Sequence, residues 1–186
     1  DQVYWGKPIS GFGDLNGNII IIGLAPAAHG ATRTGRVFTG DKSADFLFNC
    51  LFKSGLSNQP NSDHINDGLK LKNTFITLAL RCVPPEDKPT KEELKNCSAF
   101  FKEELNMIKN KKVIVALGKI AFDACIKFYK ENYGLMGSYK FGHGSKYDIN
   151  GLTIFGCYHP SPRNVNTKRI NATKMTYLLK RAKKLI

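Results

Sequence analysis

The sequence lacks the long apolar segment that a membrane-spanning helix needs. No apolar run approaches the ~18 residues of a membrane span, and no signal peptide is recognisable near the beginning. No amphipathic stretch rich in exposed aromatic residues indicates binding to a membrane surface. We therefore expect no membrane partner. The first residue is Asp1 rather than Met, so we also expect that natural sequence precedes it.

Acidic residues are scarce relative to basic ones. Lys and Arg total 28 against 15 Asp and Glu, which gives a formal net charge of +13. Such an excess favours a polyanionic partner, nucleic acid first and an anionic membrane second, while a merely solvated basic surface is the alternative. The charge is concentrated in the last segment, at Lys168, Arg169, Lys174, Lys180, Arg181, Lys183 and Lys184.

The cysteine content does not suit a disulfide-rich domain. The chain has five cysteines, an odd number, and is not a short cysteine-dense scaffold. We therefore expect a reduced, cytoplasmic protein.

The length and the hydrophobic pattern predict one α/β domain covering residues 1–186. The chain shows no internal repeat and no low-complexity linker. Continuous apolar or β-branched runs that alternate with helical segments predict a parallel sheet covered on both faces. The four predicted strands cover residues 19–25, 74–80, 112–117 and 153–158.

Four helices are predicted between and after these strands. Ser43 is the expected N-cap of a helix that stops at Gly55, and Thr90 with Glu93 forms a capping box for the next helix. The third helix covers about residues 119–131, and the last begins near residue 171. The second helix is expected to bury one face, consisting of Leu94, Cys97, Phe101, Leu105 and Ile108. Residues 1–18 read as an irregular arm.

Two polar segments follow the first and last predicted strands. They are GLAPAAHGATRTGRVFTGD (residues 23–41) and HPSPRNVNT (residues 159–167). Ligand sites in open α/β sheets form beyond the carboxyl ends of the strands, so both segments are expected at one edge. Their small residues, histidines, arginines and one aspartate predict a site for an anionic, planar ligand.

The first segment matches neither common phosphate-binding pattern. It has no Gly-x-Gly-x-x-Gly and no Gly-Lys-Ser/Thr. Its small residues instead let backbone amides approach a ligand closely. Phe38 offers an aromatic face and Asp41 a carboxylate, although a core aromatic and a helix N-terminal residue are equally good interpretations.

Together these segments resemble family 5 (type B) uracil-DNA glycosylases. Residues 23–41 resemble the first motif of that family, and HPSPR (residues 159–163) resembles the second motif of the superfamily. The similarity extends in order to YWGKPISGFGD (4–14), RCVPPEDKP (81–89) and FGHG (141–144). It implies a three-layer α/β/α sandwich with a four-stranded parallel sheet, which the hydrophobic pattern favours independently.

The resemblance implies a site for an extruded base. An enzyme that cleaves the bond between base and sugar must flip the nucleotide out of the stack. By the family's pattern Phe38 supplies the aromatic face, and His159 donates to the charge that develops on the departing base. The base-binding residues are then Gly23, Ala25, Ala27 and Phe38, together with Asp87, where relatives usually have Asn.

The first motif has no acid or amide directly after Gly23. Other uracil-DNA glycosylases use such a residue to position the attacking water, whereas this chain has Leu24 and Ala25. That absence is typical of family 5 and implies a dissociative path in which the base leaves first. Asp41 is then the candidate to stabilise the cationic sugar or to orient water.

The second motif also implies contacts with DNA. Pro160, Ser161 and Pro162 form a stiff loop that can press on the backbone, and Arg163 takes the position from which relatives insert a side chain into the duplex. Asn164 continues this loop. Arg33, Arg36 and the basic final helix are the other expected phosphate contacts, with a solvated face as the alternative for each residue.

Cys82 and Cys97 match half of the family's four-cysteine [4Fe–4S] site. The other half is a Cys-x-x-Cys near the family's N-terminus, and this chain has no cysteine before Cys50. Four thiolates are the usual complement of such a cluster. Either the missing pair lies upstream of Asp1 or the protein lacks the cluster. Cys50, Cys125 and Cys157 read as buried residues.

The leading hypothesis is a monomeric, monofunctional glycosylase that removes uracil, and also other deaminated bases such as hypoxanthine, from DNA. A nucleic-acid-binding module that kept the fold without catalysis is the alternative. A small-molecule nucleotide hydrolase is a third.

Overall fold

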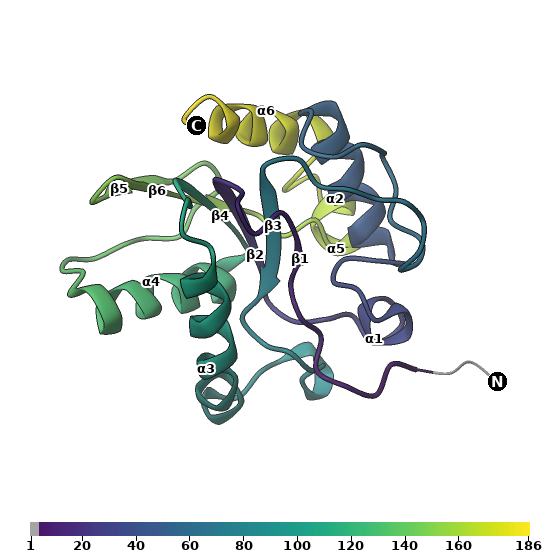
Figure 1. Ribbon diagram of the computed structural model, residues 1–186, viewed down its shortest axis with the longest axis horizontal. Coiled ribbons are helices and arrows are strands. Elements are labelled where there is room, and N and C mark those ends of the chain that lie inside the picture. The colour runs from purple at the N-terminus through teal and green to yellow at the C-terminus, as the bar shows by residue number, and fades with distance from the viewer. Residues whose placement is uncertain (1–3) are drawn as a thin grey trace.

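A six-stranded mixed sheet organises the protein, whose computed structural model describes residues 4–186. The strand order is β1-β3-β2-β4-β6-β5 (Figure 1). The four central strands are parallel, as the sequence predicts: β2 (Ile19–Gly23), β3 (Thr74–Leu78), β4 (Val113–Leu117) and β6 (Leu152–Cys157). The sequence analysis missed β1 (Phe12–Gly13) and β5 (Lys146–Ile149), which pair antiparallel at the two edges.

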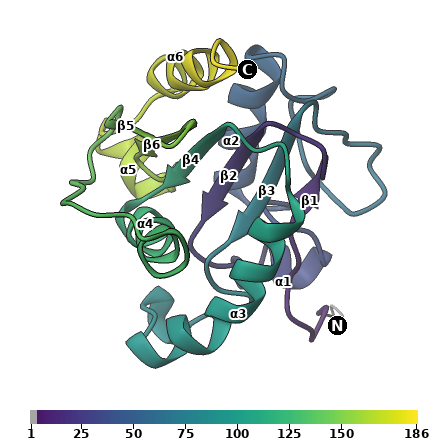
Figure 2. The same cartoon turned by 60° about the vertical axis from the view of Figure 1, so that its left-hand side comes forward.

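Helices cover both faces of the sheet, so the predicted three-layer α/β/α arrangement is confirmed (Figure 2). The α2 helix (Lys42–Lys53) and the α6 helix (Ala172–Lys183) pack on one face. The α3 helix (Lys91–Met107) and the α4 helix (Lys119–Tyr133) cover the other. Because both faces are covered, nearly every side chain of the central strands is buried.

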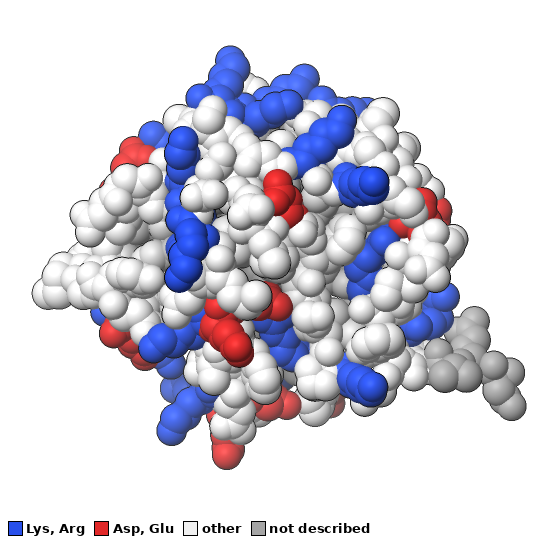
Figure 3. All heavy atoms as spheres, in the orientation of Figure 1, with Lys and Arg blue, Asp and Glu red and all other residues white. Residues whose placement is uncertain are grey.

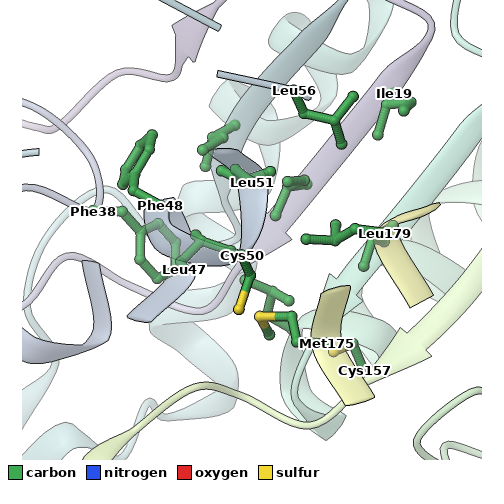
Figure 4. Close-up of a cluster of buried hydrophobic side chains, with 14 of the residues drawn as sticks. Ile19, Phe38, Leu47, Phe48, Cys50, Leu51, Leu56, Cys157, Met175 and Leu179 are labelled. Carbon is green, nitrogen blue, oxygen red and sulfur yellow. The ribbon is translucent and has the colours of Figure 1, made fainter. Parts of the chain in front are cut away.

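The core on the α2 side extends to the carboxyl edge of the sheet. Figure 4 shows Leu47 and Phe48 of α2 beside Phe38, with Met175 and Leu179 of α6 facing them. Phe38 therefore belongs to the core on one side while it reaches the edge where a ligand site is expected. Cys50, Cys125 and Cys157 are fully buried, as the sequence predicts.

Two predictions about helix ends and faces need correction. The N-cap of α2 is Asp41 rather than Ser43, because the Asp41 carboxylate accepts hydrogen bonds from the backbone N–H groups of Ser43 and Ala44. The predicted capping box of Thr90 and Glu93 is confirmed. In α3, however, Leu94 and Cys97 are only half-buried, because the first turns of this helix extend beyond the sheet (Figure 1).

Short elements gather at the carboxyl edge. The α1 helix (Ala31–Thr34) follows β2, the 3₁₀ helix η1 (Pro85–Asp87) follows β3, and the α5 helix (Pro162–Asn166) follows β6. The N-terminal arm is tied down near them by Arg81, whose Nη1 donates to the Ile9 carbonyl at 3.1 Å. None of the helices in residues 4–186 combines the length and the apolar character that crossing a membrane requires.

Candidate active site

A small cavity of about 50 Å³ opens at the carboxyl edge of the sheet, where the two predicted segments meet. The first segment supplies most of the wall, and His159 of the second segment completes it. The sequence-predicted residues Ala25, Ala27, Phe38, Asp41 and His159 all line the cavity, together with Pro26 and Ser43. The structure therefore brings together, in one place, side chains from opposite ends of the chain.

Phe38 presents its ring to this cavity from a strained backbone position. Its φ of 47° lies in the left-handed region, which is uncommon for a bulky residue. Gly23 makes the position possible, because a Cβ there would lie 2.8 Å from the Phe38 ring. The ring is 7% exposed, and its centroid lies 6.0 Å from that of the His159 ring with 32° between the planes.

His159 lies two residues after the end of β6, and its loop holds it in place. The side-chain amide of Asn164 donates to the His159 carbonyl at 2.9 Å, while Ser161 caps α5. Within the described residues, the ring nitrogens of His159 have no hydrogen-bond partner. Burial lowers the pKa of His159 to about 4, so the imidazole is neutral at pH 7 and has one N–H free to donate.

Asp41 caps the α2 helix and also lines the cavity. Its Oδ1 caps α2, while Oδ2 lies against Gly30, where a Cβ would collide with it. Burial raises the pKa of Asp41, and the hydrogen bonds from Ala44 and Ser43 oppose that rise. The structure thus shows the helix cap, which uses Oδ1 alone, and the catalytic interpretation of Asp41 stays a prediction that is compatible with it.

The expected DNA contacts of the second segment divide into two groups. Pro162 and Arg163 are exposed beside the cavity and are available to a ligand. Ser161 and Asn164 are half-buried, and both form hydrogen bonds within the loop. Arg33 is also half-buried, and its Nε donates to the His29 carbonyl at 3.0 Å, which braces the first segment.

The predicted phosphate contact of Arg36 is wrong. This side chain is 4% exposed and forms an ion pair with Asp67 at 2.6 Å. Its remaining guanidinium hydrogens are donated to Thr39, Ser62 and the Ile65 carbonyl. Burial alone would raise the pKa of Asp67. The Arg36 contacts and the backbone N–H groups of Leu69 and Asp63 outweigh burial and hold this pKa well below its usual range. Arg36 is thus a buried structural residue.

Asp87 lies away from the wall of the cavity. It is exposed in η1 with a φ of 56°, and the described lining residues do not include it. A base-binding role for Asp87 therefore remains a prediction from the resemblance.

The described residues do not complete an iron–sulfur site. Cys82 is exposed and Cys97 is half-buried, which distinguishes them from the three buried cysteines. Within residues 4–186, no group of three or more His, Cys, Asp or Glu side chains is placed to hold a metal ion. Two thiolates are half of the set that a [4Fe–4S] cluster requires.

The sequence analysis missed several parts of the site. Pro26 and Ser43 line the cavity, Gly30 accommodates the Asp41 carboxylate, and Asn164 positions His159 rather than reaching outward. Pro26 and Ser43 lie within or just after the first motif, so proximity in sequence was the available signal. The role of Asn164 depends on a loop geometry that residue spacing does not reveal.

The fold and the cavity define an α/β protein in which an aromatic ring, a neutral imidazole and a carboxylate surround a small cavity at the carboxyl edge of the sheet. The model of the family described as the uracil DNA glycosylase superfamily matches residues 10–183, so the chain belongs to this superfamily.

Similarity to individual relatives covers nearly the whole chain. This chain is 44% identical to the Type-5 uracil-DNA glycosylase of Pyrobaculum aerophilum, over 96% of this chain and 76% of the relative. It is 41% identical to the Type-5 enzyme of Thermus thermophilus, over 99% of this chain and 83% of the relative. A Type-4 uracil-DNA glycosylase of Pyrobaculum aerophilum is 26% identical, over 85% of this chain and 74% of the relative.

Proposed function

We propose that this protein is a monofunctional DNA glycosylase that excises uracil by hydrolysing the bond between base and sugar. The observation that carries the proposal is the juxtaposition of Phe38, His159 and Asp41 around one cavity. The family and its Type-5 relatives support the same activity. The target nucleotide must leave the duplex to reach this cavity.

Phe38 and His159 act on the base. The Phe38 ring stacks on the face of the extruded base, and its strained backbone places the ring at the cavity before the base arrives. Negative charge develops on the base as the glycosidic bond breaks. The neutral His159 imidazole donates an N–H to that charge from a half-buried position, where less water competes for the interaction than at the surface.

Asp41 acts on the sugar side of the bond. The segment after β2 presents Leu24, Ala25 and Pro26, so it holds no acid that could activate water there. The base therefore departs first, and the free carboxylate oxygen of Asp41 stabilises the cationic sugar or orients the water that adds to it. The raised pKa of Asp41 follows from the same burial that strengthens its interaction with a nearby cation.

The exposed residues beside the cavity handle the strand. Pro162 and Arg163 are exposed and follow His159 closely in sequence, which supports a contact with the duplex that delivers the base. Arg163 fills the space that the extruded nucleotide leaves.

Release of uracil from a labelled duplex tests the proposed function. Under single-turnover conditions the native protein leaves an abasic site that alkali converts to a strand break. His159→Ala lowers the rate by about 100-fold or more. His64→Asn is the matched control, because it changes an exposed histidine outside the cavity wall. Equal product from the native and His159→Ala proteins contradicts the assignment. Tight, salt-sensitive binding without product supports a non-catalytic module.

We propose that the protein also excises deaminated bases larger than uracil. The small residues Ala25, Pro26 and Ala27 form part of the cavity wall, and no bulky tyrosine follows Pro26 to exclude larger bases. Duplexes that contain hypoxanthine or xanthine measure this range. Release of uracil alone contradicts it.

We also propose that Cys82 and Cys97 are the two thiolates this chain contributes to a [4Fe–4S] cluster. Their exposure relative to the buried cysteines supports this assignment. The cluster then needs two further thiolates, and none of the steps above passes through it. Iron content and visible absorbance of Cys82→Ser and native protein test the assignment.

We propose a single chain as the functional unit, since one chain supplies the aromatic ring, the imidazole and the carboxylate of the cavity. The five free cysteines support a reducing, cytoplasmic location.

A further inference from the structure

The end of the chain carries positive charge that the candidate active site does not use. Residues 164–186 contain seven Lys and Arg residues and no Asp or Glu. Figure 3 shows basic side chains gathered along the top of the molecule, where α6 lies in Figure 1. Over α3, at the bottom of the same view, basic and acidic side chains are mixed.

One stripe of α6 concentrates this charge. At ~100° per residue, five residues between Lys174 and Lys184 fall within an arc of ~120°, opposite the buried Met175 and Leu179. Tyr177 is 65% exposed, and the Arg181 guanidinium lies 5.8 Å from its ring centroid. The α6 outer stripe consists of Lys174, Tyr177, Lys180, Arg181 and Lys184.

The lysines of the α6 outer stripe have no acidic partner within residues 4–186. The ion pairs among these residues lie elsewhere, and the only α6 lysine that donates a side-chain hydrogen bond there is Lys183, which caps α2 through the carbonyls of Ser54 and Gly55. Lys180 and Lys184 are i,i+4 neighbours of like charge and repel each other. The stripe therefore adds repulsion to the fold that an external anion would relieve.

Lys180 and Lys184, in the C-terminal half of the stripe, lie far from the candidate active site. Lys183 contacts the C-terminal end of α2, whereas Asp41 caps its N-terminal end. A helix of 12 residues is about 18 Å long, so Lys180 and Lys184 lie roughly that far from the cavity. Because α2 leads back from the carboxyl edge of the sheet, Lys180 and Lys184 lie toward the opposite end of the sheet, away from the edge at which a duplex delivers a base to His159 (Figure 1).

We propose that the α6 outer stripe binds the phosphate backbone of a second DNA segment, separate from the duplex that enters the active site. The stripe spans about 15 Å along the helix and combines spaced cations with an exposed aromatic ring, which suits a sugar–phosphate backbone. The choice of DNA as partner rests on the proposed function. Binding two segments lets the protein pass between neighbouring stretches of DNA without full release.

The experiment compares two triple variants that remove the same charge. Lys174→Gln, Lys180→Gln and Lys184→Gln neutralise the stripe. Lys91→Gln, Lys95→Gln and Lys102→Gln neutralise exposed lysines of α3, where acidic residues alternate with them. Each protein is first saturated with a short uracil-analogue duplex that resists cleavage. A second, undamaged fluorescent duplex is then titrated by anisotropy at several salt concentrations.

The native protein and the α3 variant are expected to bind the second duplex equally well. The stripe variant is expected to bind it about tenfold or more weakly, with a log–log salt slope smaller by about 2.7 for three lost phosphate contacts. Single-turnover excision from the short duplex should be the same in all three proteins. Binding of the second duplex is measured without catalysis, so its outcome is independent of the excision assay.

Four results would overturn the proposal. In the first, the preloaded native protein would bind no second duplex. In the second, both triple variants would bind the second duplex equally weakly, so that net charge alone would explain the effect. Alternatively, the stripe variant slows excision from the short duplex, which places the stripe on the duplex in the active site. Finally, binding of anionic vesicles or of polyglutamate to the stripe, with no binding of the second duplex, would assign the stripe to another partner.

Discussion

The rings of Phe38 and His159 lie with their centroids 6.0 Å apart and their planes tilted by 32°, although they come from opposite ends of the chain. Gly23, at the end of β2, supplies the space that the Phe38 ring occupies. The two rings thus form adjacent walls of one cavity, and each can be tested apart from the other.

Phe38→Leu should separate stacking from stability. Loss of the ring removes base–aromatic stacking worth ~1–3 kcal/mol, so we expect kcat/KM for uracil release to fall by about tenfold or more. Phe48→Leu is the matched control, since Phe48 is also buried but lies in the core on α2, outside the cavity wall. That variant should lower the melting temperature and leave the activity of the folded protein unchanged. Equal activity losses in both variants would assign Phe38 to packing alone.

Asp41→Asn should lose activity without losing the helix cap. Asparagine caps a helix about as well as aspartate, so the free energy of unfolding should change by less than ~1 kcal/mol. Excision should fall by about tenfold or more, because the neutral amide does not stabilise a cationic sugar. Asp41→Ala should show both losses, and Thr90→Ala should lose only the cap of α3. Full activity in Asp41→Asn would leave the residue with the cap as its only function.

The stability of the native protein should fall in acid partly through His159. In the folded protein burial lowers the pKa of His159 to about 4, whereas the unfolded chain takes up the proton near pH 6.5. His159 therefore makes its full contribution to the free energy of unfolding above pH 6.5. That contribution is lost as the pH falls toward 4, by up to about 3 kcal/mol. Urea unfolding of the native protein and of His159→Asn at pH 7 and pH 4.5 measures it. The difference between the two proteins isolates His159 from the carboxylates that titrate in both. No pH dependence in that difference would show that the folded imidazole is not shielded from protons.

Arg36 and Arg163 should behave in opposite ways. Arg36→Ala leaves Asp67 as an unpaired buried charge, so it should destabilise the protein by about 3–5 kcal/mol. Arg163→Ala changes an exposed side chain and should leave the melting temperature nearly unchanged, while excision from duplex DNA falls. Thermal unfolding and single-turnover excision on the same preparations distinguish them. A stable Arg36→Ala protein with weakened DNA binding would restore the predicted phosphate contact.

Asn164 should act through His159. Asn164→Ala removes the hydrogen bond to the His159 carbonyl, so we expect kcat to fall several-fold with little change in KM. Asn164→Gln, which retains the amide on a longer side chain, should recover part of the loss. A change in KM alone would assign Asn164 to DNA contact.

The sequence by itself determined the parallel strands, the capping box of Thr90 and Glu93, and the meeting of residues 23–41 with His159 at one edge. These features follow from local hydrophobic period, local hydrogen bonds and the shared direction of parallel strands. The family resemblance added roles for Phe38 and His159 that spacing alone left open.

Only the tertiary structure decided which polar side chains are free. Arg36 finds Asp67 and Ser62, which are more than 20 residues away in sequence, and a buried guanidinium must be paired wherever its partners lie. The place of α6 behind the active site, and of Asn164 beneath His159, depends on how whole elements pack. Local sequence determines which residues can carry charge, whereas packing determines whether that charge faces a partner, the core or solvent.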